Sequence, residues 1–299
     1  MSWLTPSLAA DEARLSRWRR AVGPPVVQRN ASGFATPADE LTVVSWNIAN
    51  GAGDLPAFLK TVPSDRPLIL LLQEAFRSGP DVPTPMEPGA FFAGRLGGST
   101  ADADVPDVEA LAASLGFNLY YVPSMRNGGP SSDEDRGNAI LSTLPLEDLL
   151  AVELPFERQR RVAVAATIRG VSSSGAPWNI RVVSAHLDGF ARARYGWLGG
   201  EFSRARQARA LREAIEREGP VVLGADLNTW FGFTEPAYSE TALAFPDTRV
   251  TDMRATFRSL LRLDHLFFRL DDGWRAEFHR GEERFGSDHF PLVGTVHLR

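Results

Sequence analysis

One stretch of the chain ends an apolar run in a carboxylate and a carboxamide. Residues 221–225, VVLGA, are typical of a buried strand, and Asp226-Leu227-Asn228 follow them directly. Asp226 and Asn228 are two positions apart, so their side chains point to the same side of an extended backbone. A rigid sheet would fix the separation of the two groups, as a reaction site requires. Taken alone, the pattern also fits a turn or a helix cap.

Other strand-like runs of the sequence also end in polar side chains. The residues that close these runs are Asn47, Glu74, Asn138, His186, Asp226, Asn228, Asp264, His265, Asp288 and His289. If the strands end at one edge of a sheet, these side chains form a site. If the strand ends are scattered, the same residues belong to ordinary loops.

The spacing of apolar residues predicts strands and helices in irregular alternation. Strands are predicted at residues 41–47, 68–72, 117–122, 137–142, 161–168, 178–185, 221–225, 263–270, 275–279 and 291–297. Helices are predicted at residues 11–20, 107–115, 201–218 and near 253–261. Because several strands are joined by short turns, a mixed sheet or two sheets fit better than a purely parallel sheet. The sequence therefore predicts an α/β fold.

The domain organisation follows from the same pattern. Residues 41–299 are predicted to form one domain, because this stretch shows neither an internal repeat nor a linker. Residues 1–40 are predicted to form an N-terminal helix and a polar lead-in that starts at Gly23. Residues 77–106, rich in Gly, Pro and Asp, are predicted to form a long loop.

Composition excludes several classes of protein. The chain of 299 residues is 43% hydrophobic and 23% charged, as in soluble globular proteins. It has no cysteine, which rules out disulfides and thiolate metal sites. The net charge of -5 argues against general adhesion to nucleic acid, although it allows a local basic groove. We find no run of about 18 apolar residues and no signal peptide, so we expect a cytoplasmic protein without an obligate protein partner.

The ordered series of polar strand ends resembles the endonuclease/exonuclease/phosphatase superfamily of deoxyribonuclease-I-like, metal-dependent phosphoesterases. The matching motifs are Ser45-Trp46-Asn47, Leu72-Gln73-Glu74, Arg136-Gly137-Asn138-Ala139-Ile140, Ser184-Ala185-His186-Leu187, Gly224-Ala225-Asp226-Leu227-Asn228, Leu263-Asp264-His265 and Gly286-Ser287-Asp288-His289. The match covers residues 41–299 in the family's order, and the conjunction is far more specific than any single motif. The resemblance implies a four-layer sandwich of two packed mixed β-sheets flanked by helices, with the site at one end.

The resemblance also implies a divalent metal, Mg²⁺ with Mn²⁺ as the alternative, at Glu74, Asn47 and Asp288. Glu74 is a hard oxygen ligand of the kind that Mg²⁺ prefers. Asn47 would support the metal or a phosphate oxygen, and Asp288 matches a family residue that lies near or on the metal. The alternatives are a capping or ion-pairing carboxylate for Glu74 and a turn amide for Asn47.

The implied reaction is hydrolysis of a phosphoester by one-step attack of water. The family residue that matches Asp226 orients or deprotonates the water, and Asn228 would donate to an oxygen of the transition state. His289 would bind the phosphate and stabilise developing charge, while Asp264 would hold this histidine by a hydrogen bond. His186 matches the family's second histidine, often treated as the acid near the leaving group; its alternative is a core histidine.

The substrate stays open between nucleic acid, phospholipid and a small phosphate ester. The loop after His186 combines Arg192 and Arg194 with three aromatic residues, and the loop after Asn228 carries Trp230 with two phenylalanines. Arginine with aromatic residues suits a phosphate and a stacked base, whereas exposed aromatic residues suit a lipid or an apolar headgroup. Packing of the aromatic residues onto the core is the alternative.

Two further positions have open roles. Asn138 either touches the phosphate or only braces the site. The run RQRR at residues 158–161 either adds phosphate contacts or is a charged entry to a strand. The abasic-endonuclease branch of the family carries a tyrosine where this chain has His186, which weakens a DNA-repair interpretation.

These observations favour a metal-dependent phosphoesterase, with phosphodiesters as the expected substrates. The alternative from another class is a catalytically silent binding or scaffold protein on the same fold. The chain fills every position that the family pattern requires, which argues for an enzyme.

Overall fold

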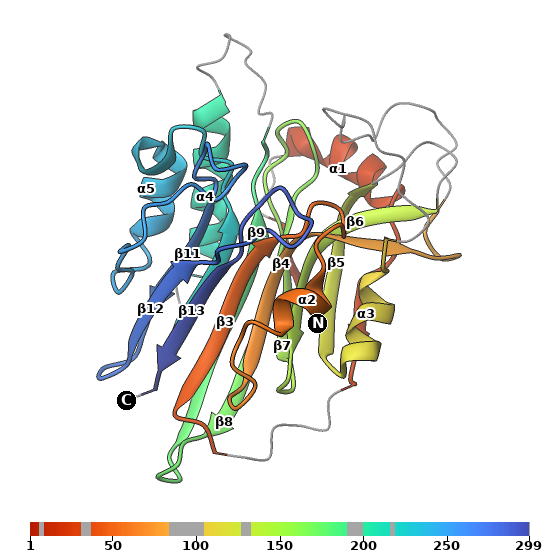
Figure 1. The fold of residues 1–299 in the computed structure, drawn as a ribbon. Helices are drawn as coiled ribbons and strands as arrows, with labels where there is room; N and C mark the ends of the chain where they lie inside the picture. Colours follow the sequence, from red (N-terminus) through yellow and green to blue (C-terminus); the bar gives the residue numbers. More distant parts are fainter. Residues whose placement is uncertain are drawn as a thin grey trace.

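The protein is built on two β-sheets packed face to face (Figure 1). The computed structural model describes residues 1–5, 9–30, 37–83, 105–126, 133–189, 200–215 and 219–298. Both sheets are mixed, with six strands in one and seven in the other. The prediction of an α/β sandwich of two mixed sheets is therefore confirmed.

The six-stranded sheet has the strand order β1-β7-β8-β9-β10-β11. Its strands are β1 (Ser2–Leu4), β7 (Glu147–Glu153), β8 (Val162–Val171), β9 (Pro177–His186), β10 (Val221–Asp226) and β11 (Asp264–Arg269). Strand β10 is buried along its whole length and lies between a parallel and an antiparallel neighbour. A strand enclosed in this way reads as a continuous apolar run, as residues 221–225 do.

The seven-stranded sheet has the strand order β12-β13-β3-β4-β6-β5-β2. Its strands are β2 (Val26–Gln28), β3 (Glu40–Asn47), β4 (Leu68–Ser78), β5 (Asn118–Arg126), β6 (Glu134–Ser142), β12 (Arg275–Arg280) and β13 (Leu292–His297). The pairing of β4 with β6 shifts register between Leu72 and Ala75, which marks a β-bulge at Gln73-Glu74. A bulge re-aims a side chain relative to its strand, and here it re-aims one of the predicted site residues.

Helices cover the outer faces of both sheets and complete four layers (Figure 1). The helices are α1 (Glu12–Arg19), α2 (Leu55–Leu59), α3 (Val108–Leu115), α4 (Gly200–Ile215) and α5 (Pro236–Ala242), with short 3₁₀ turns at Ala9–Asp11 and Gly232–Thr234. Helices α4 and α5 pack on the six-stranded sheet, whereas α2 and α3 pack on the seven-stranded sheet. Between the sheets, valine, leucine and isoleucine side chains from both inner faces form the central core. None of the helices in the described segments is both long and apolar enough to cross a membrane.

The structure agrees with most of the predicted elements and corrects one of them. Asp107 caps α3 by accepting hydrogen bonds from two backbone N–H groups, and Gly116 ends this helix with φ of 71°. The helix predicted near residues 253–261 is wrong. That segment instead makes a tight turn in which Phe257 pairs with Leu261. Strands β1, β2 and β7 and helices α2 and α5 were not predicted from the sequence.

The N-terminal residues contribute an edge strand to each sheet. Strand β1 pairs in parallel with β7, and β2 pairs antiparallel with β5. Residues 26–28 are thus a strand within the segment that was predicted to be a polar lead-in. The division at residue 40 into a lead-in and a domain stays a prediction.

A buried ion pair fixes the loop between β7 and β8. The carboxylate of Glu153, with 0% exposure, accepts a hydrogen bond of 2.5 Å from Arg160 Nε and is also paired with Arg19. Arg160 is 2% exposed and donates a further bond of 2.8 Å to the carbonyl oxygen of Pro123. Removing one partner of a buried pair leaves the other charge uncompensated, which costs more than the pair itself contributes.

We therefore predict that Glu153→Ala lowers the free energy of unfolding by about 3–5 kcal/mol. Urea denaturation at 25 °C followed by circular dichroism measures this change. The control is Arg169→Ala, which removes an exposed arginine paired with Glu147 and Asp148 and should change stability by less than about 1 kcal/mol. Equal effects of the two substitutions would contradict the prediction.

Candidate active site

Three of the predicted site residues form one row across the six-stranded sheet. Asp226, the last residue of β10, lies opposite His186 of β9 in the parallel pairing and opposite Asp264 of β11 in the antiparallel pairing. All three residues are at least 95% buried, with exposures of 1%, 5% and 0% in that order. Because residues in one register row share a face of the sheet, the three side chains point toward the opposing sheet.

The seven-stranded sheet supplies the other half of the site. Asn47 ends β3, Glu74 sits in the bulge of β4, and His289 lies three residues before the start of β13. Glu74 has a φ of 53°, and Asn228 beyond β10 has a φ of 52°. Left-handed backbone is uncommon for residues other than glycine and gathers at functional sites. The chain therefore adopts strained backbone at two of the predicted site residues.

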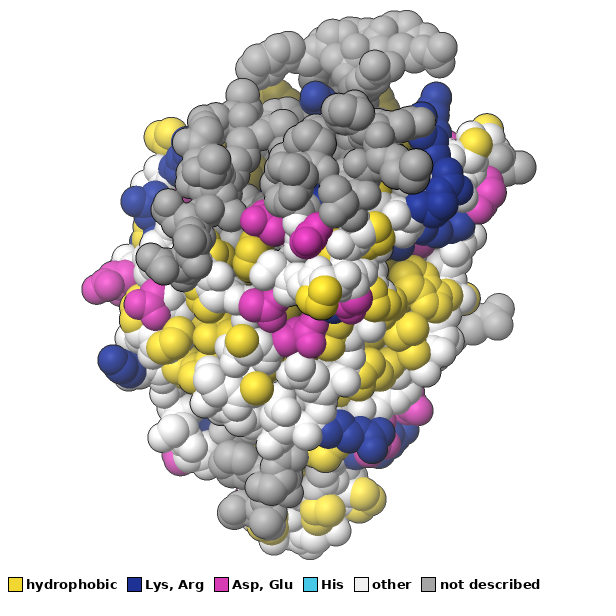
Figure 2. All heavy atoms as spheres, turned by 90° about the vertical axis from the view of Figure 1, so that its right-hand side faces the viewer, with side chains coloured by type: hydrophobic (Ala, Val, Ile, Leu, Met, Phe, Trp, Pro, Cys, Tyr) yellow, Lys and Arg dark blue, Asp and Glu magenta, His cyan; other side chains and the backbone are white. Residues whose placement is uncertain are grey.

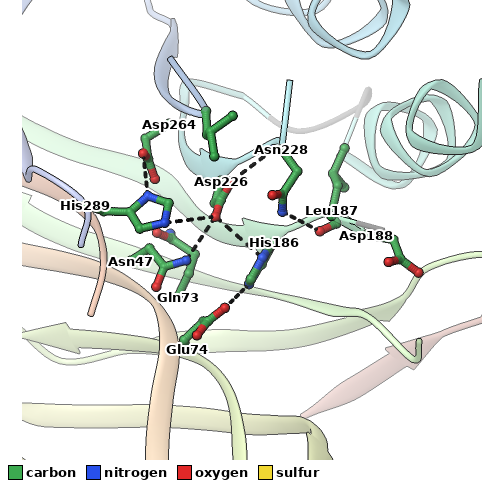
Figure 3. A network of polar contacts seen from close by, with 12 residues as sticks. Asn47, Gln73, Glu74, His186, Leu187, Asp188, Asp226, Asn228, Asp264 and His289 are labelled. Carbon is green, nitrogen blue, oxygen red and sulfur yellow. Dashed lines mark hydrogen bonds and ion pairs between the residues drawn. The ribbon is translucent and has the colours of Figure 1, made fainter. Parts of the chain in front are cut away.

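The carboxylate of Asp226 is the centre of the polar network (Figure 3). Its Oδ2 accepts a hydrogen bond of 2.9 Å from Asn47 Nδ2 and lies 3.5 Å from His186 Nε2 and 3.9 Å from His289 Nε2. Its Oδ1 accepts a bond of 2.9 Å from the backbone N–H of Asn228. One carboxylate thus connects residues from four separate stretches of the chain.

Asp264 holds His289 in a fixed orientation. The distance from Asp264 Oδ2 to His289 Nδ1 is 2.7 Å, so Nδ1 carries a proton and Nε2 faces Asp226. The ring of Phe257 packs against the imidazole at 4.8 Å between ring centroids, and the indole N–H of Trp46 donates to the carbonyl oxygen of His289. The turn at residues 257–261, which replaces the predicted helix, supplies the Phe257 contact.

The buried charges shift the pKa values of Asp226 and His289 in the same direction. Burial, together with the charge of Asp264, raises the pKa of Asp226 to about 7. Burial would lower the pKa of His289, but the charges of Asp264 and Asp226 outweigh it and raise this pKa to about 10. His289 is therefore an imidazolium at neutral pH, and Asp226 titrates close to neutrality.

Glu74 and His186 lie on the other side of Asp226. Glu74 Oε2 accepts a hydrogen bond of 3.0 Å from Arg136, and its Oε1 lies 3.9 Å from His186 Nδ1. Burial would raise the pKa of Glu74, but Arg136, Arg161 and His289 together lower it, so the side chain is a carboxylate. Burial, aided by Arg161 and Arg136, lowers the pKa of His186 well below its usual value. His186 is therefore neutral.

The side chains of the remaining predicted residues bind partners outside this network. Asn228 Nδ2 donates to the carbonyl oxygen of Leu187 at 3.0 Å, and Asn138 Nδ2 braces β8 through the carbonyl oxygen of Val162 at 2.7 Å. Asp288, beside His289, forms an ion pair of 3.2 Å with Arg258.

The loop residues predicted to frame the substrate are only partly described. Trp230 is 38% exposed and bonds through its indole N–H to Gly189. Phe231 is also exposed, whereas Phe233 packs on Tyr238. The packing alternative thus holds for one of these three aromatic residues. Arg192 and Arg194 lie outside the described residues.

Of the residues that support the site, Gln73 and Arg136 received no role from the sequence, and Arg161 received only the open role of the RQRR run. Gln73 is fully buried and donates to Ser184 Oγ at 3.1 Å and to the carbonyl oxygen of Leu71 at 3.0 Å, which ties the two sheets together beneath Asp226. Arg136 and Arg161 lie against Glu74 and His186. Gln73 and Arg136 stand in motifs that match the family, and this position could have indicated a role in the site. For Arg161 the corresponding indication was its place at the end of the RQRR run.

The donor set of the site can hold a divalent cation. The carboxylates of Asp226 and Asp264 lie within 4.8 Å of one another beside His289, and as an imidazolium His289 offers no lone pair to a metal. Asp264 Oδ1 is buried and has no hydrogen-bond partner among the described residues. Glu74 and Asp288 add carboxylates and Asn47 adds an amide oxygen, which are the hard donors that Mg²⁺ and Mn²⁺ take. The residues present therefore fit such an ion.

Solved structures with the same fold cover most of the chain. An endonuclease/exonuclease/phosphatase protein from Beutenbergia cavernae DSM 12333 matches with a TM-score of 0.61 at 18% identity, over 87% of this chain and 72% of that one. The human Nocturnin catalytic domain with bound sulfate anion matches with a TM-score of 0.54 at 19% identity, over 94% and 98%. A mutant beta toxin from Staphylococcus aureus with bound magnesium ions matches with a TM-score of 0.52 at 14% identity, over 86% and 99%.

Comparison at the level of sequence identifies the family. None of the curated protein sequences matches this chain. The sequence model of the Endonuclease/Exonuclease/phosphatase family, by contrast, matches residues 44–289, which include every site residue described above. The resemblance found from the ordered motifs is confirmed, and the chain belongs to the endonuclease/exonuclease/phosphatase family.

Proposed function

We propose that the protein is a Mg²⁺-dependent phosphoester hydrolase that acts on phosphodiesters by one-step attack of water. Membership of the family indicates a metal-dependent phosphoesterase. The proposal of this mechanism is supported by the network around Asp226. There a buried carboxylate lies beside the imidazolium of His289, the neutral imidazole of His186 and the amide of Asn47. These are the groups that hydrolysis of a phosphoester needs: a base, a cation and neutral donors.

Asp226 acts as the general base in this proposal. A base works best when its pKa is near the operating pH, and burial beside Asp264 raises the pKa of Asp226 to about 7. The hydrogen bonds from Asn47 and from the backbone of Asn228 fix the orientation of the carboxylate. The side-chain amide of Asn228 donates to an oxygen of the transition state without adding charge.

The two histidines stabilise charge in different ways. His289 is protonated and offers Nε2–H beside Asp226, so it attracts a phosphate oxygen as its charge develops. His186 is neutral because burial and two arginines lower its pKa. We propose that His186 meets the leaving-group oxygen as a neutral N–H donor.

Glu74, Asn47 and Asp288 would hold the metal ion. Asp264 is committed to His289 through a bond of 2.7 Å, so we leave it out of this set. When bound, the ion polarises phosphoryl oxygens and offsets their negative charge. Arg136 donates a hydrogen bond to Oε2 of Glu74 and thereby fixes the orientation of this carboxylate.

The charge and the exposed aromatic residues of the surface help to distinguish the possible substrates. On the face shown in Figure 2, acidic groups lie near the centre and at the left edge, and the largest basic group lies at the upper right. A nuclease would rely on a local groove and would lose affinity steeply with added salt. An enzyme that acts on a phospholipid or a small phosphate ester would bind its substrate with an affinity that depends little on salt. Exposed Trp230 and Phe231 suit a stacked base or an apolar headgroup.

Replacement of a metal ligand should weaken metal binding. We predict that Glu74→Gln raises the Kd for Mn²⁺ at least about tenfold, because the amide offers a neutral oxygen in place of a carboxylate. Isothermal titration calorimetry measures the Kd. The control Glu147→Gln alters an exposed carboxylate on β7 and should leave the Kd unchanged. A Glu74→Gln protein that binds Mn²⁺ as tightly as the wild type would remove Glu74 from the metal set.

Removal of the base should abolish turnover without unfolding the protein. We predict that Asp226→Asn lowers kcat for bis(p-nitrophenyl) phosphate by about 10²–10⁴-fold, the range for a lost general base. The midpoint of thermal unfolding should not fall by more than a few degrees, because the carboxylate is buried beside Asp264 and its charge is unfavourable there. The exposed substitution Asp148→Asn serves as the control. Unchanged turnover in Asp226→Asn would refute the mechanism.

The pairing of Asp264 with His289 should set the alkaline limit of activity. Because the pKa of His289 is raised to about 10, the imidazolium persists through neutral pH and is lost as pH rises through about 10. Asp264→Asn removes the charge that raises this pKa. We predict that the alkaline limb of the pH profile of kcat/KM moves to lower pH in Asp264→Asn, and an unmoved limb would contradict the role of His289.

A further inference from the structure

The chain leaves the six-stranded sheet at Asn228, in a backbone conformation that needs support. Asn228 is the residue that we propose to donate to an oxygen of the transition state, and its φ of 52° is left-handed. A residue other than glycine keeps this conformation where the surrounding structure holds it. The side-chain amide itself bonds to the carbonyl oxygen of Leu187 (Figure 3). The position of this amide therefore depends on what fixes the backbone on either side of it.

The extension of β10 is tied to the segment before β11 at two points. The backbone N–H of Leu227 donates a hydrogen bond of 2.9 Å to the carbonyl oxygen of Leu263. At the next carbonyl of that segment, Arg262, the donor is a side chain, because the hydroxyl of Thr229 donates to it at 3.1 Å. Thr229 is fully buried. The left-handed turn at Asn228 thus lies between two anchors, a backbone bond before it and a side-chain bond after it.

His265 of β11 contacts the second anchor. It follows Asp264 and points to the opposite face of the sheet, because side chains alternate along a strand. Its ring is 2% exposed, and its Nε2 lies 2.9 Å from Thr229 Oγ1. Three aromatic rings enclose the imidazole at 5.0–5.7 Å between centroids, those of Phe233, Tyr238 and Phe267. The contact with Thr229 is therefore made inside a packed aromatic cluster.

The direction of this hydrogen bond follows from the single proton of the hydroxyl. A carbonyl oxygen only accepts, so Thr229 gives its proton to Arg262 and accepts one from His265. Burial, with the charge of Arg262, lowers the pKa of His265 well below its usual value, so the ring is neutral and carries its proton on Nε2. The hydroxyl then has a partner both as donor and as acceptor, which fixes its orientation.

We infer that His265 is a positioning residue, which holds Thr229 and, through Thr229, keeps Asn228 in the orientation that meets the transition state. This inference rests on the proposed function, because that proposal assigns Asn228 to the reaction. Strand β11 then supports the site from both of its faces. Asp264 orients His289 on the inner face, and His265 orients the turn at Asn228 from the outer face.

The first test does not depend on turnover. Two-dimensional amide NMR spectra of the full chain in EDTA show the side-chain amide of Asn228, which is assigned by its loss in Asn228→Asp. His265→Phe keeps an aromatic ring and removes the donor, so it should move this signal. Thr229→Val removes the hydroxyl without changing a ring and should move it as well.

The control for these spectra is His279→Phe, the same change at an exposed position of β12. It should leave the Asn228 signal in place. An Asn228 signal that stays unmoved in folded His265→Phe and Thr229→Val proteins would overturn the inference.

Hydrolysis of bis(p-nitrophenyl) phosphate in Mg²⁺ gives the second test. His265→Phe should lower kcat about tenfold with KM unchanged, because a displaced group that acts in the transition state costs rate rather than substrate binding. His265→Gln keeps a side-chain N–H donor and should retain kcat within about threefold. A histidine that only fills the core would lower the unfolding midpoint in both variants and leave kcat unchanged, which would contradict the inference.

A double-mutant cycle tests whether His265 acts through Thr229. Thr229→Val should lower kcat as His265→Phe does, and the double variant should be no slower than the slower single variant. Losses that multiply in the double variant would overturn action through Thr229. A wild type that hydrolyses no phosphoester would refute the proposed function alone, and the amide spectra would then decide whether His265 fixes Asn228.

Discussion

The hydrogen bond from Asn47 to Asp226 joins the two sheets at the site, and the arrangement of the other groups depends on it. Asn47 ends a strand of one sheet, and Asp226 ends a strand of the other. The sheets approach closely beneath this bond: a Cβ placed on Gly224 would lie 2.7 Å from Ser45 Cβ. Gln73 and Ser184 add a second buried polar bridge at the same level. Two rigid frames thus hold the halves of one site in register.

Charge is the second constraint on the site. Asp226 and Asp264 are neighbours in one register row, and each is buried. Two adjacent buried carboxylates repel each other, and His289 between them relieves the repulsion by carrying a proton. On the opposite side, Arg136 and Arg161 keep Glu74 ionised, and burial together with these arginines keeps His186 neutral. The same fold therefore holds one protonated and one neutral histidine on the two sides of a single carboxylate.

Much of this arrangement could be predicted from the sequence, because the site residues end strongly apolar strands. The run before Asp226 indicated a buried strand, whereas the register that places His186 and Asp264 beside it comes from pairing between distant strands. The turn at residues 257–261 could not be predicted, since its apolar spacing matches that of a helix while its contacts with His289 come from elsewhere in the chain. The buried ion pair of Glu153 with Arg160 could not be predicted either, because the sequence does not show which arginine of the RQRR run meets a carboxylate. The bulge that turns Glu74 into the site is likewise a product of pairing between distant strands.

We propose that the Asp226 network carries out metal-dependent hydrolysis of a phosphodiester. The most direct test is the hydrolysis of bis(p-nitrophenyl) phosphate by the wild type in Mg²⁺, in Mn²⁺ and in EDTA, with p-nitrophenyl phosphate measured in parallel. We expect the diester to be hydrolysed with either metal and EDTA to abolish this turnover. Turnover that persists in EDTA, or a folded protein that hydrolyses neither ester with either metal, would contradict metal-dependent hydrolysis at Asp226.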